Sequence, residues 1–144
     1  MLYYRRTTKP DPISDWGHAM FADNIDKIEG YGKHLWSIDS KHCIPISKLR
    51  SEIIKKWKHD QKHGFEGDFG GSVMPNSEYY KISAEKIADS FDPEDIVDHA
   101  DAWDSDLMVW FWERIAEPKN IMAISTYDGA ICFDASLINA EKDD

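Results

Sequence analysis

Apolar and polar positions change period along the chain, from strand-like segments near the N-terminus to helix-like segments in the middle. Aromatic and β-branched residues fill residues 2–8 (LYYRRTT) and predict a first strand. Pro10 and Pro12 follow and are expected to end it. Residues 34–38 (HLWSI) predict a second strand, and residues 24–29 predict one helical turn before it.

The middle of the chain has apolar residues at the three-to-four-residue spacing of helices. Three faces result: Leu49, Ile53, Ile54 and Trp57; Ile96, Val97, Ala100 and Trp103; and Leu107, Trp110, Phe111 and Ile115. Pro93 is expected to open the second helix, and Asp104 or Ser105 to cap the third. Ser83 predicts a further short helix, whereas the glycine-rich residues 64–76 predict a long loop.

A β-hairpin is predicted at the C-terminal end. Residues 121–126 and 130–134 favour strands, and Tyr127-Asp128-Gly129 between them is a turn signal. The order of strands, helices and closing hairpin favours the α+β class, with small central β-sheets and helices in the middle of the chain. We expect residues 1–144 to form a single domain.

Composition fits a folded domain with a core rich in rings. The 144 residues are 42% hydrophobic and include 6 Trp, 6 Tyr and 6 Phe. No apolar run is long enough to span a membrane, and residues 1–10 lack the apolar stretch of a signal peptide. We therefore expect a cytoplasmic protein with no membrane partner, in which Cys43 and Cys132 are reduced.

Charge is large and unevenly distributed. The formal net charge of −10 disfavours direct binding of nucleic acid, because phosphates attract Lys and Arg. Residues 48–63 are rich in Lys, whereas residues 92–106 contain Asp and Glu but no Lys or Arg. The acidic stretch is either a solvated helix face or a docking surface for a basic protein partner. Docking would make the chain a non-catalytic inhibitor or nucleic-acid mimic, acting through Asp95, Asp98, Asp101 and Asp104.

Two histidines raise the question of a metal. His59 and His63 stand four residues apart, a spacing at which two imidazoles on a helix can share an ion. Asp60 stands where a zinc-protease helix has Glu, neighbouring lysines add positive charge, and Gly64 is expected to end the helix. We therefore predict no metal site.

Arg5 and Arg6 are the first candidates for ligand binding. Because side chains alternate along a strand, the two arginines are expected on opposite faces. A guanidinium that faces the interior needs an anionic partner, such as a carboxylate or a phosphate. The alternative is an edge strand with both arginines solvated.

Three segments, Tyr4-Arg5-Arg6-Thr7, Met20-Phe21-Ala22-Asp23 and residues 31–39 (YGKHLWSID), together resemble the ADP-ribosyltransferase-like family. The resemblance implies that the first strand holds the nicotinamide and ribose of NAD, through Arg5 or Arg6 and Thr7. It also implies that the rings of Phe21 and Tyr31 stack on nicotinamide. The alternative is that both rings are ordinary core residues.

The same resemblance implies a catalytic acid before a late strand, and Asp128 is the matching position. Its carboxylate would stabilise the oxocarbenium-like ribose as nicotinamide leaves. The alternative is that Asp128 and Gly129 only form the turn. The implied activity is an NAD-dependent mono-ADP-ribosyltransferase that modifies a protein target.

The sequence departs from the family pattern at several positions. Arg6 stands where Gly is usual, and neither Ser-Thr-Ser nor a Glu-x-Glu before a final strand occurs. These departures favour the non-catalytic alternative. The short acidic chain also resembles phage-encoded inhibitors of bacterial defence that share this fold.

Overall fold

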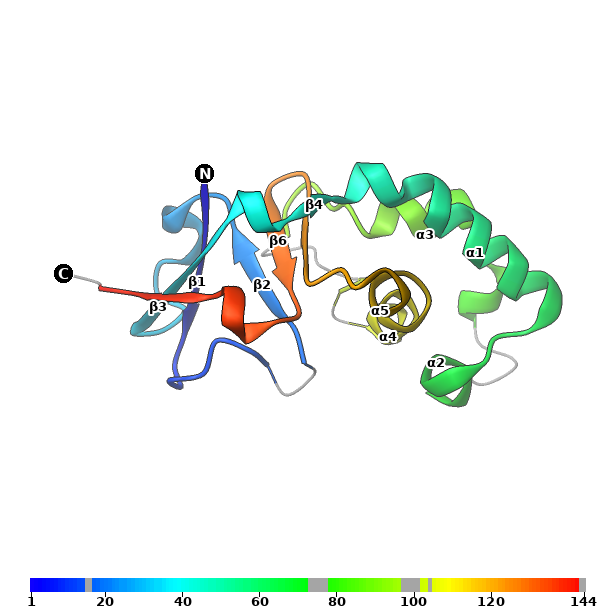
Figure 1. Ribbon diagram of the computed structural model, residues 1–144, viewed down its shortest axis with the longest axis horizontal. Helices are drawn as coiled ribbons and strands as arrows, with labels where there is room; N and C mark the ends of the chain where they lie inside the picture. Colours follow the sequence, from blue (N-terminus) through cyan, green and yellow to red (C-terminus); the bar gives the residue numbers. More distant parts are fainter. Residues whose placement is uncertain (15–16, 73–77, 97–101, 104, 143–144) are drawn as a thin grey trace. The chain divides into compact units, whose positions relative to one another are not determined.

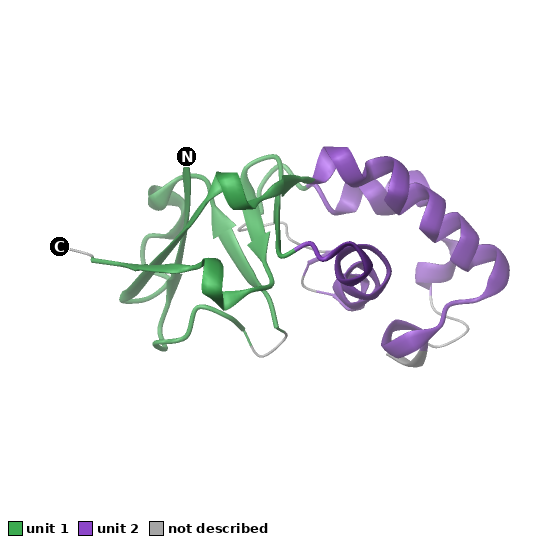
Figure 2. Cartoon of the chain, in the orientation of Figure 1, with its two compact units in different colours: residues 1–45, 93–99, 122–144 green, residues 46–92, 100–121 purple. Residues whose placement is uncertain are grey.

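A computed structural model describes residues 1–14, 17–72, 78–96, 102–103 and 105–142. The chain divides into two compact units (Figure 2). The first, which we call the sheet unit, comprises residues 1–45, 93–99 and 122–144. The second, the helical unit, comprises residues 46–92 and 100–121. The division into two compact units does not test whether residues 1–144 form a single domain, which stays a prediction.

The strands of the described part of the chain form one seven-stranded mixed sheet in the order β4-β5-β6-β2-β1-β3-β7 (Figure 1). Their bounds are β1 Leu2–Thr7, β2 Ala19–Ala22, β3 His34–Asp39, β4 Ile44–Pro45, β5 Ala123–Ser125, β6 Gly129–Cys132 and β7 Asn139–Glu141. The β4–β5 pair is parallel and the remaining pairs are antiparallel. Three 3₁₀ turns complete the unit: η1 Ile25–Ile28, η2 Ser40–His42 and η6 Ala135–Leu137.

Both predicted N-terminal strands, the helical turn between them and the C-terminal hairpin are confirmed. Strand β2 was not predicted. Its sequence, AMFA, has no β-branched residue, so local propensity gives little signal. Pairing with β1 on one side and β6 on the other holds it in the sheet.

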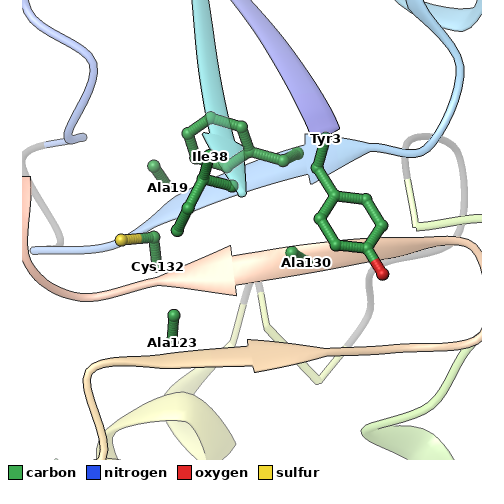
Figure 3. Packing of buried hydrophobic residues seen from close by; sticks show 7 residues of the cluster. Tyr3, Ala19, Ile38, Ala123, Ala130 and Cys132 are labelled. Carbon is green, nitrogen blue, oxygen red and sulfur yellow. The ribbon is translucent and has the colours of Figure 1, made fainter. Parts of the chain in front are cut away.

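A hydrophobic cluster covers one face of the sheet (Figure 3). Its buried members are Tyr3, Ala19, Phe21, Ile38, Ala123, Ala130 and Cys132. A second cluster contains Ala22, Ile28 and Leu35, against which Tyr4 packs. Successive residues of β1 thus contribute to different clusters, as strand alternation requires. Both cysteines are free, and burial raises the pKa of the Cys132 thiol to about 11.

The helical unit contains eight short to medium helical segments in its described part. They are η3 Ile46–Leu49, α1 Arg50–His63, α2 Gly67–Ser72, η4 Glu78–Lys81, α3 Ala84–Ser90, α4 Asp106–Phe111, the π-helical turn η5 Trp112–Ala116 and α5 Glu117–Lys119. Ser83 and Ser105 cap α3 and α4, because their hydroxyls accept backbone N–H groups of the first turn. Mixed α and β structure agrees with the predicted α+β class.

Aromatic rings form the core of the helical unit. The ring centres of Trp57 and Trp110 lie 5.0 Å apart, as do those of Phe91 and Trp103. Phe69 is fully buried beside Trp57, with 6.0 Å between ring centres. The ring-rich core predicted from composition is confirmed. On the apolar face of α1, Trp57 therefore packs against other rings of this core.

Two local predictions are wrong. The loop predicted over residues 64–76 contains α2, although this helix includes three glycines. Burial of Phe69 and a bond from Asp68 N to Glu113 Oε1 at 3.0 Å supply the stability that glycine lacks. The helix predicted to begin at Pro93 is absent from residues 93–96, and its remaining residues 97–101 lie outside the described part. No helix among the described residues is long and apolar enough to cross a membrane.

Candidate functional site

Arg5 and Arg6 lie half-buried on β1 and bond to different parts of the sheet unit. Arg5 Nε donates to Pro12 O at 2.8 Å, and its Nη1 donates to Met20 O at 3.3 Å. Arg6 Nη1 donates to Gly32 O at 3.5 Å. The two guanidiniums therefore have separate partners, which fits the expected alternation along β1.

A surface hollow of about 330 Å³ lies where β1 passes into the following loop. Its lining includes Arg5, Thr7, Lys9 and Asp11. The Thr7 hydroxyl donates to Lys9 O at 2.6 Å and accepts from Trp36 Nε1 at 2.8 Å. Two of the residues predicted to bind NAD, Arg5 and Thr7, thus line one hollow.

Trp36 is a neighbour of this hollow that sequence reasoning missed: it packs against the hydrophobic cluster and bonds to one lining residue, Thr7. It pairs with Arg5 in the register of β1 and β3, so both side chains point to the same face of the sheet. Its indole is half-buried and donates to Thr7. Register could have identified it, because Trp36 is central in the predicted second strand and lies opposite Arg5 once the two strands pair.

The two rings expected to stack on nicotinamide have different environments. Phe21 is fully buried in the cluster of Figure 3, so its ring has no exposed face for a ligand. This burial supports the core interpretation of Phe21. Tyr31 is 52% exposed and follows η1, next to Gly32. Gly32 carries the carbonyl to which Arg6 donates, so Tyr31 lies near the Arg6 side of β1.

Asp128 is a buried carboxylate with both oxygens engaged. Its Oδ1 accepts from Ile96 N at 3.0 Å, and its Oδ2 pairs with Lys27 Nζ at 3.1 Å. Lys27 also pairs with Asp23 Oδ1 at 2.9 Å. Hydrogen bonds to Asp23 and Asp128 raise the pKa of Lys27, so the ammonium stays charged. The carboxylate therefore ties the hairpin turn to two other segments of the sheet unit.

The register separates Asp128 from Arg5. Ala22 on β2 pairs with Tyr4 on one side and with Gly129 on the other. Asp128 and Arg5 lie one residue beyond this row in opposite directions, with β2 between their strands. Standard strand spacings then put their backbones about 12 Å apart. The sheet holds both predicted residues without bringing them together.

A second cleft, of about 270 Å³, lies within the helical unit and includes His59, Asp60, His63, Glu113 and Arg114 in its lining. Asp60 is only 5% exposed. It accepts from Trp110 Nε1 at 2.9 Å and from Arg114 through Nε and Nη2, both at 3.0 Å. Sequence reasoning found the histidines but missed Arg114 and Trp110. No local signal could find them, because about fifty residues separate them from Asp60.

Glu113 closes one side of this cleft. Its Oε1 accepts from Asp68 N at 3.0 Å, and burial raises the pKa of its carboxyl. Gly67 lies against the same carboxylate, so a Cβ at this position would require the Glu113 side chain to shift. Glu113 thus joins η5 to the start of α2 in a cleft that His59 and His63 also line.

The acidic surface expected to bind a basic partner is largely outside the described residues. Asp98, Asp101 and Asp104 lie there, whereas Asp95 is half-buried in the sheet unit. The docking hypothesis for residues 92–106 therefore stays a prediction from the sequence.

Comparisons of the chain with protein-family models, with curated proteins and with solved structures found no match.

Proposed function

We propose that this chain is an ADP-ribosyltransferase-like protein that binds NAD at the hollow beside Arg5 and Thr7. In this proposal it acts on a protein target through binding, without ADP-ribose transfer by Asp128. One contrast carries the proposal: Arg5 and Thr7 share an open hollow, while both oxygens of Asp128 are engaged and buried.

The chemistry of the hollow suits a dinucleotide. Arg5 and Lys9 supply positive charge for a pyrophosphate. Asp11 can accept from ribose hydroxyls, because among the described residues its one hydrogen bond is from Ile13 N to Oδ1 at 3.0 Å. Trp36 offers a half-buried indole for stacking, in the role that the resemblance implied for Phe21.

The environment of Asp128 argues against catalysis at that residue. A carboxylate that stabilises an oxocarbenium-like ribose must present a free oxygen to the reacting carbon. Asp128 is 5% exposed, and Lys27 already neutralises its charge. Transfer would require either the Lys27 pair or the Ile96 hydrogen bond to break first, because each occupies one of the two oxygens.

The test is calorimetric titration of NAD into the whole chain, with Lys9→Ala and Lys41→Ala as a matched pair. Lys9 lines the hollow and is exposed, so its removal should weaken NAD binding about tenfold without affecting the fold. Lys41 is an exposed lysine of η2 outside the hollow lining, and its loss should leave binding unchanged. Nicotinamide release by the same samples should stay at the background rate.

Three outcomes would reject the proposal. Absence of saturable heat with NAD, or equal weakening in both lysine variants, would show that the hollow does not bind it. Nicotinamide release that disappears in Asp128→Asn would instead restore the transferase assignment.

A further inference from the structure

The last turn of α1 presents two imidazoles next to each other on the wall of the helical-unit cleft. The helix includes both His59 and His63 and ends at Gly64, whose N–H donates to Asp60 O at 2.8 Å. The two ring centres lie 4.5 Å apart, and both side chains are exposed. The helix therefore extends far enough for the pair to act together.

Asp60 holds His59 in one orientation. Its Oδ1 lies 3.2 Å from His59 Nδ1, while Trp110 and Arg114 fix the carboxylate from the other sides. A carboxylate can only accept, so His59 carries its proton on Nδ1 and its lone pair on Nε2. A buried carboxylate behind an exposed imidazole is the usual outer partner of a metal-binding histidine.

The separation of the rings fits two imidazoles on one metal ion. With a metal–nitrogen bond of about 2.1 Å, each ring centre lies about 3.2 Å from the ion. Two such rings at about 90° would be about 4.5 Å apart, and at the tetrahedral angle about 5.2 Å. The distance of 4.5 Å between His59 and His63 matches the smaller angle. Angles near 90° are typical of Ni²⁺ and Cu²⁺ with nitrogen and oxygen ligands.

The charge of the cleft favours a cation over an anion. Three carboxylates, from Asp60, Glu66 and Glu113, line it together with one guanidinium, from Arg114. Arg114 is already committed to Asp60 through two nitrogens. A phosphate or carboxylate ligand would meet more negative than positive charge here, whereas a divalent ion would be attracted.

We propose that His59 and His63 form a two-histidine site for a divalent transition-metal ion, with Ni²⁺ and Cu²⁺ as the preferred ions. No group of three or more His, Cys, Asp or Glu is arranged around one metal position in the described part of the chain. Water molecules therefore complete the coordination, and Asp60 positions His59 from behind. The site is independent of NAD binding at the sheet unit.

The first test is calorimetric titration of untagged full-length chain with NiCl₂ alone. We expect one ion per chain, with affinity lowered at least about tenfold in both His59→Ala and His63→Ala, because even loss of an outer partner costs about that much. His42→Ala removes an exposed imidazole of η2 in the sheet unit and should leave the affinity unchanged. Circular dichroism of all three variants checks that the helices are retained.

A second measurement locates the ion. Paramagnetic Ni²⁺ should broaden the indole N–H signal of Trp110, which bonds to the same carboxylate as His59, and His63→Ala should abolish this broadening. The proposal is overturned if no saturable Ni²⁺ binding occurs up to millimolar concentration. It is also overturned if His63→Ala and His42→Ala bind Ni²⁺ equally.

Discussion

In the described part of each unit one aspartate is buried, and the two residues are held in different ways. Asp60 in the helical unit and Asp128 in the sheet unit are both 5% exposed. Asp60 receives the two-pronged guanidinium of Arg114 and an indole N–H, whereas Asp128 receives the single ammonium of Lys27 and a backbone N–H. The first arrangement is rigid and planar, and the second depends on a flexible side chain.

This difference decides what each carboxylate can do. Asp60 also contacts the exposed imidazole of His59 and is thereby connected to the cleft surface. Asp128 contacts only Lys27 and Ile96 through its side chain, among the contacts of the described residues, and both serve to hold segments of the sheet unit. The exposed group beside Asp60 is an imidazole, which can bind a metal ion, whereas the exposed group beside Asp128, the Lys27 ammonium, is already paired with both Asp23 and Asp128.

The largest loss of stability is expected for Asp60→Ala. The substitution leaves the Arg114 guanidinium and the Trp110 indole N–H without their acceptor. Breaking a buried pair costs about 3–5 kcal/mol, and the low end applies because Arg114 is 35% exposed. Urea unfolding should show the loss. The double variant Asp60→Leu with Arg114→Met should be more stable than Asp60→Ala, because it leaves no guanidinium unpaired. If Asp60→Ala lowers the free energy of unfolding by less than about 1 kcal/mol, the rigid arrangement around Asp60 is contradicted.

An intermediate loss of stability is expected for Asp128→Ala, and Asp128→Asn is the variant with which to compare it. Alanine leaves the buried Ile96 N–H unsatisfied, which costs about 1–3 kcal/mol. Asparagine keeps an oxygen for that N–H and loses only the charge pair with Lys27, so it should lie between alanine and the wild type. The same urea unfolding series measures both. Equal stability of the two variants would show that the backbone hydrogen bond contributes nothing.

Local sequence patterns predicted the parts of the fold that local forces determine. The strand around Arg5 and Arg6, the Ser83 and Ser105 caps and the hairpin at Asp128 depend on near neighbours in the chain. Strand β2 and helix α2 depend on distant partners instead. Their own residues, with Ala in one and Gly in the other, favour neither structure.

The site residues follow the same division. Alternation correctly separated Arg5 from Arg6, and both have distinct partners. The sequence left open whether Phe21 is a core residue and whether Asp128 serves only the turn, because the answer depends on β6, Lys27 and other segments remote in sequence. Trp36 needed the register between β1 and β3, which no single segment contains.

The smallest change in stability is expected for substitution of Lys27, the flexible partner of Asp128. Its pKa is raised from 10.5 by hydrogen bonds to Asp23 and then Asp128. A group with a raised pKa in the folded state stabilises below its unfolded pKa, and that contribution is lost as the pH rises above it. The stability difference between wild type and Lys27→Met should therefore be constant from pH 7 to about pH 9 and shrink above about pH 10.5.

Thermal unfolding at stepped pH measures this difference, with Lys41→Met as the control for net charge because Lys41 is an exposed lysine remote in sequence from Asp23 and Asp128. The effect is small because the Lys27 side chain is 36% exposed and water screens the pair. A difference that grows with pH, or one that Lys41→Met reproduces, would mean that Lys27 does not hold Asp128. The Asp128 carboxylate would then be held by the Ile96 N–H alone. The two aspartates would differ in that Asp60 has a charged partner and Asp128 has none.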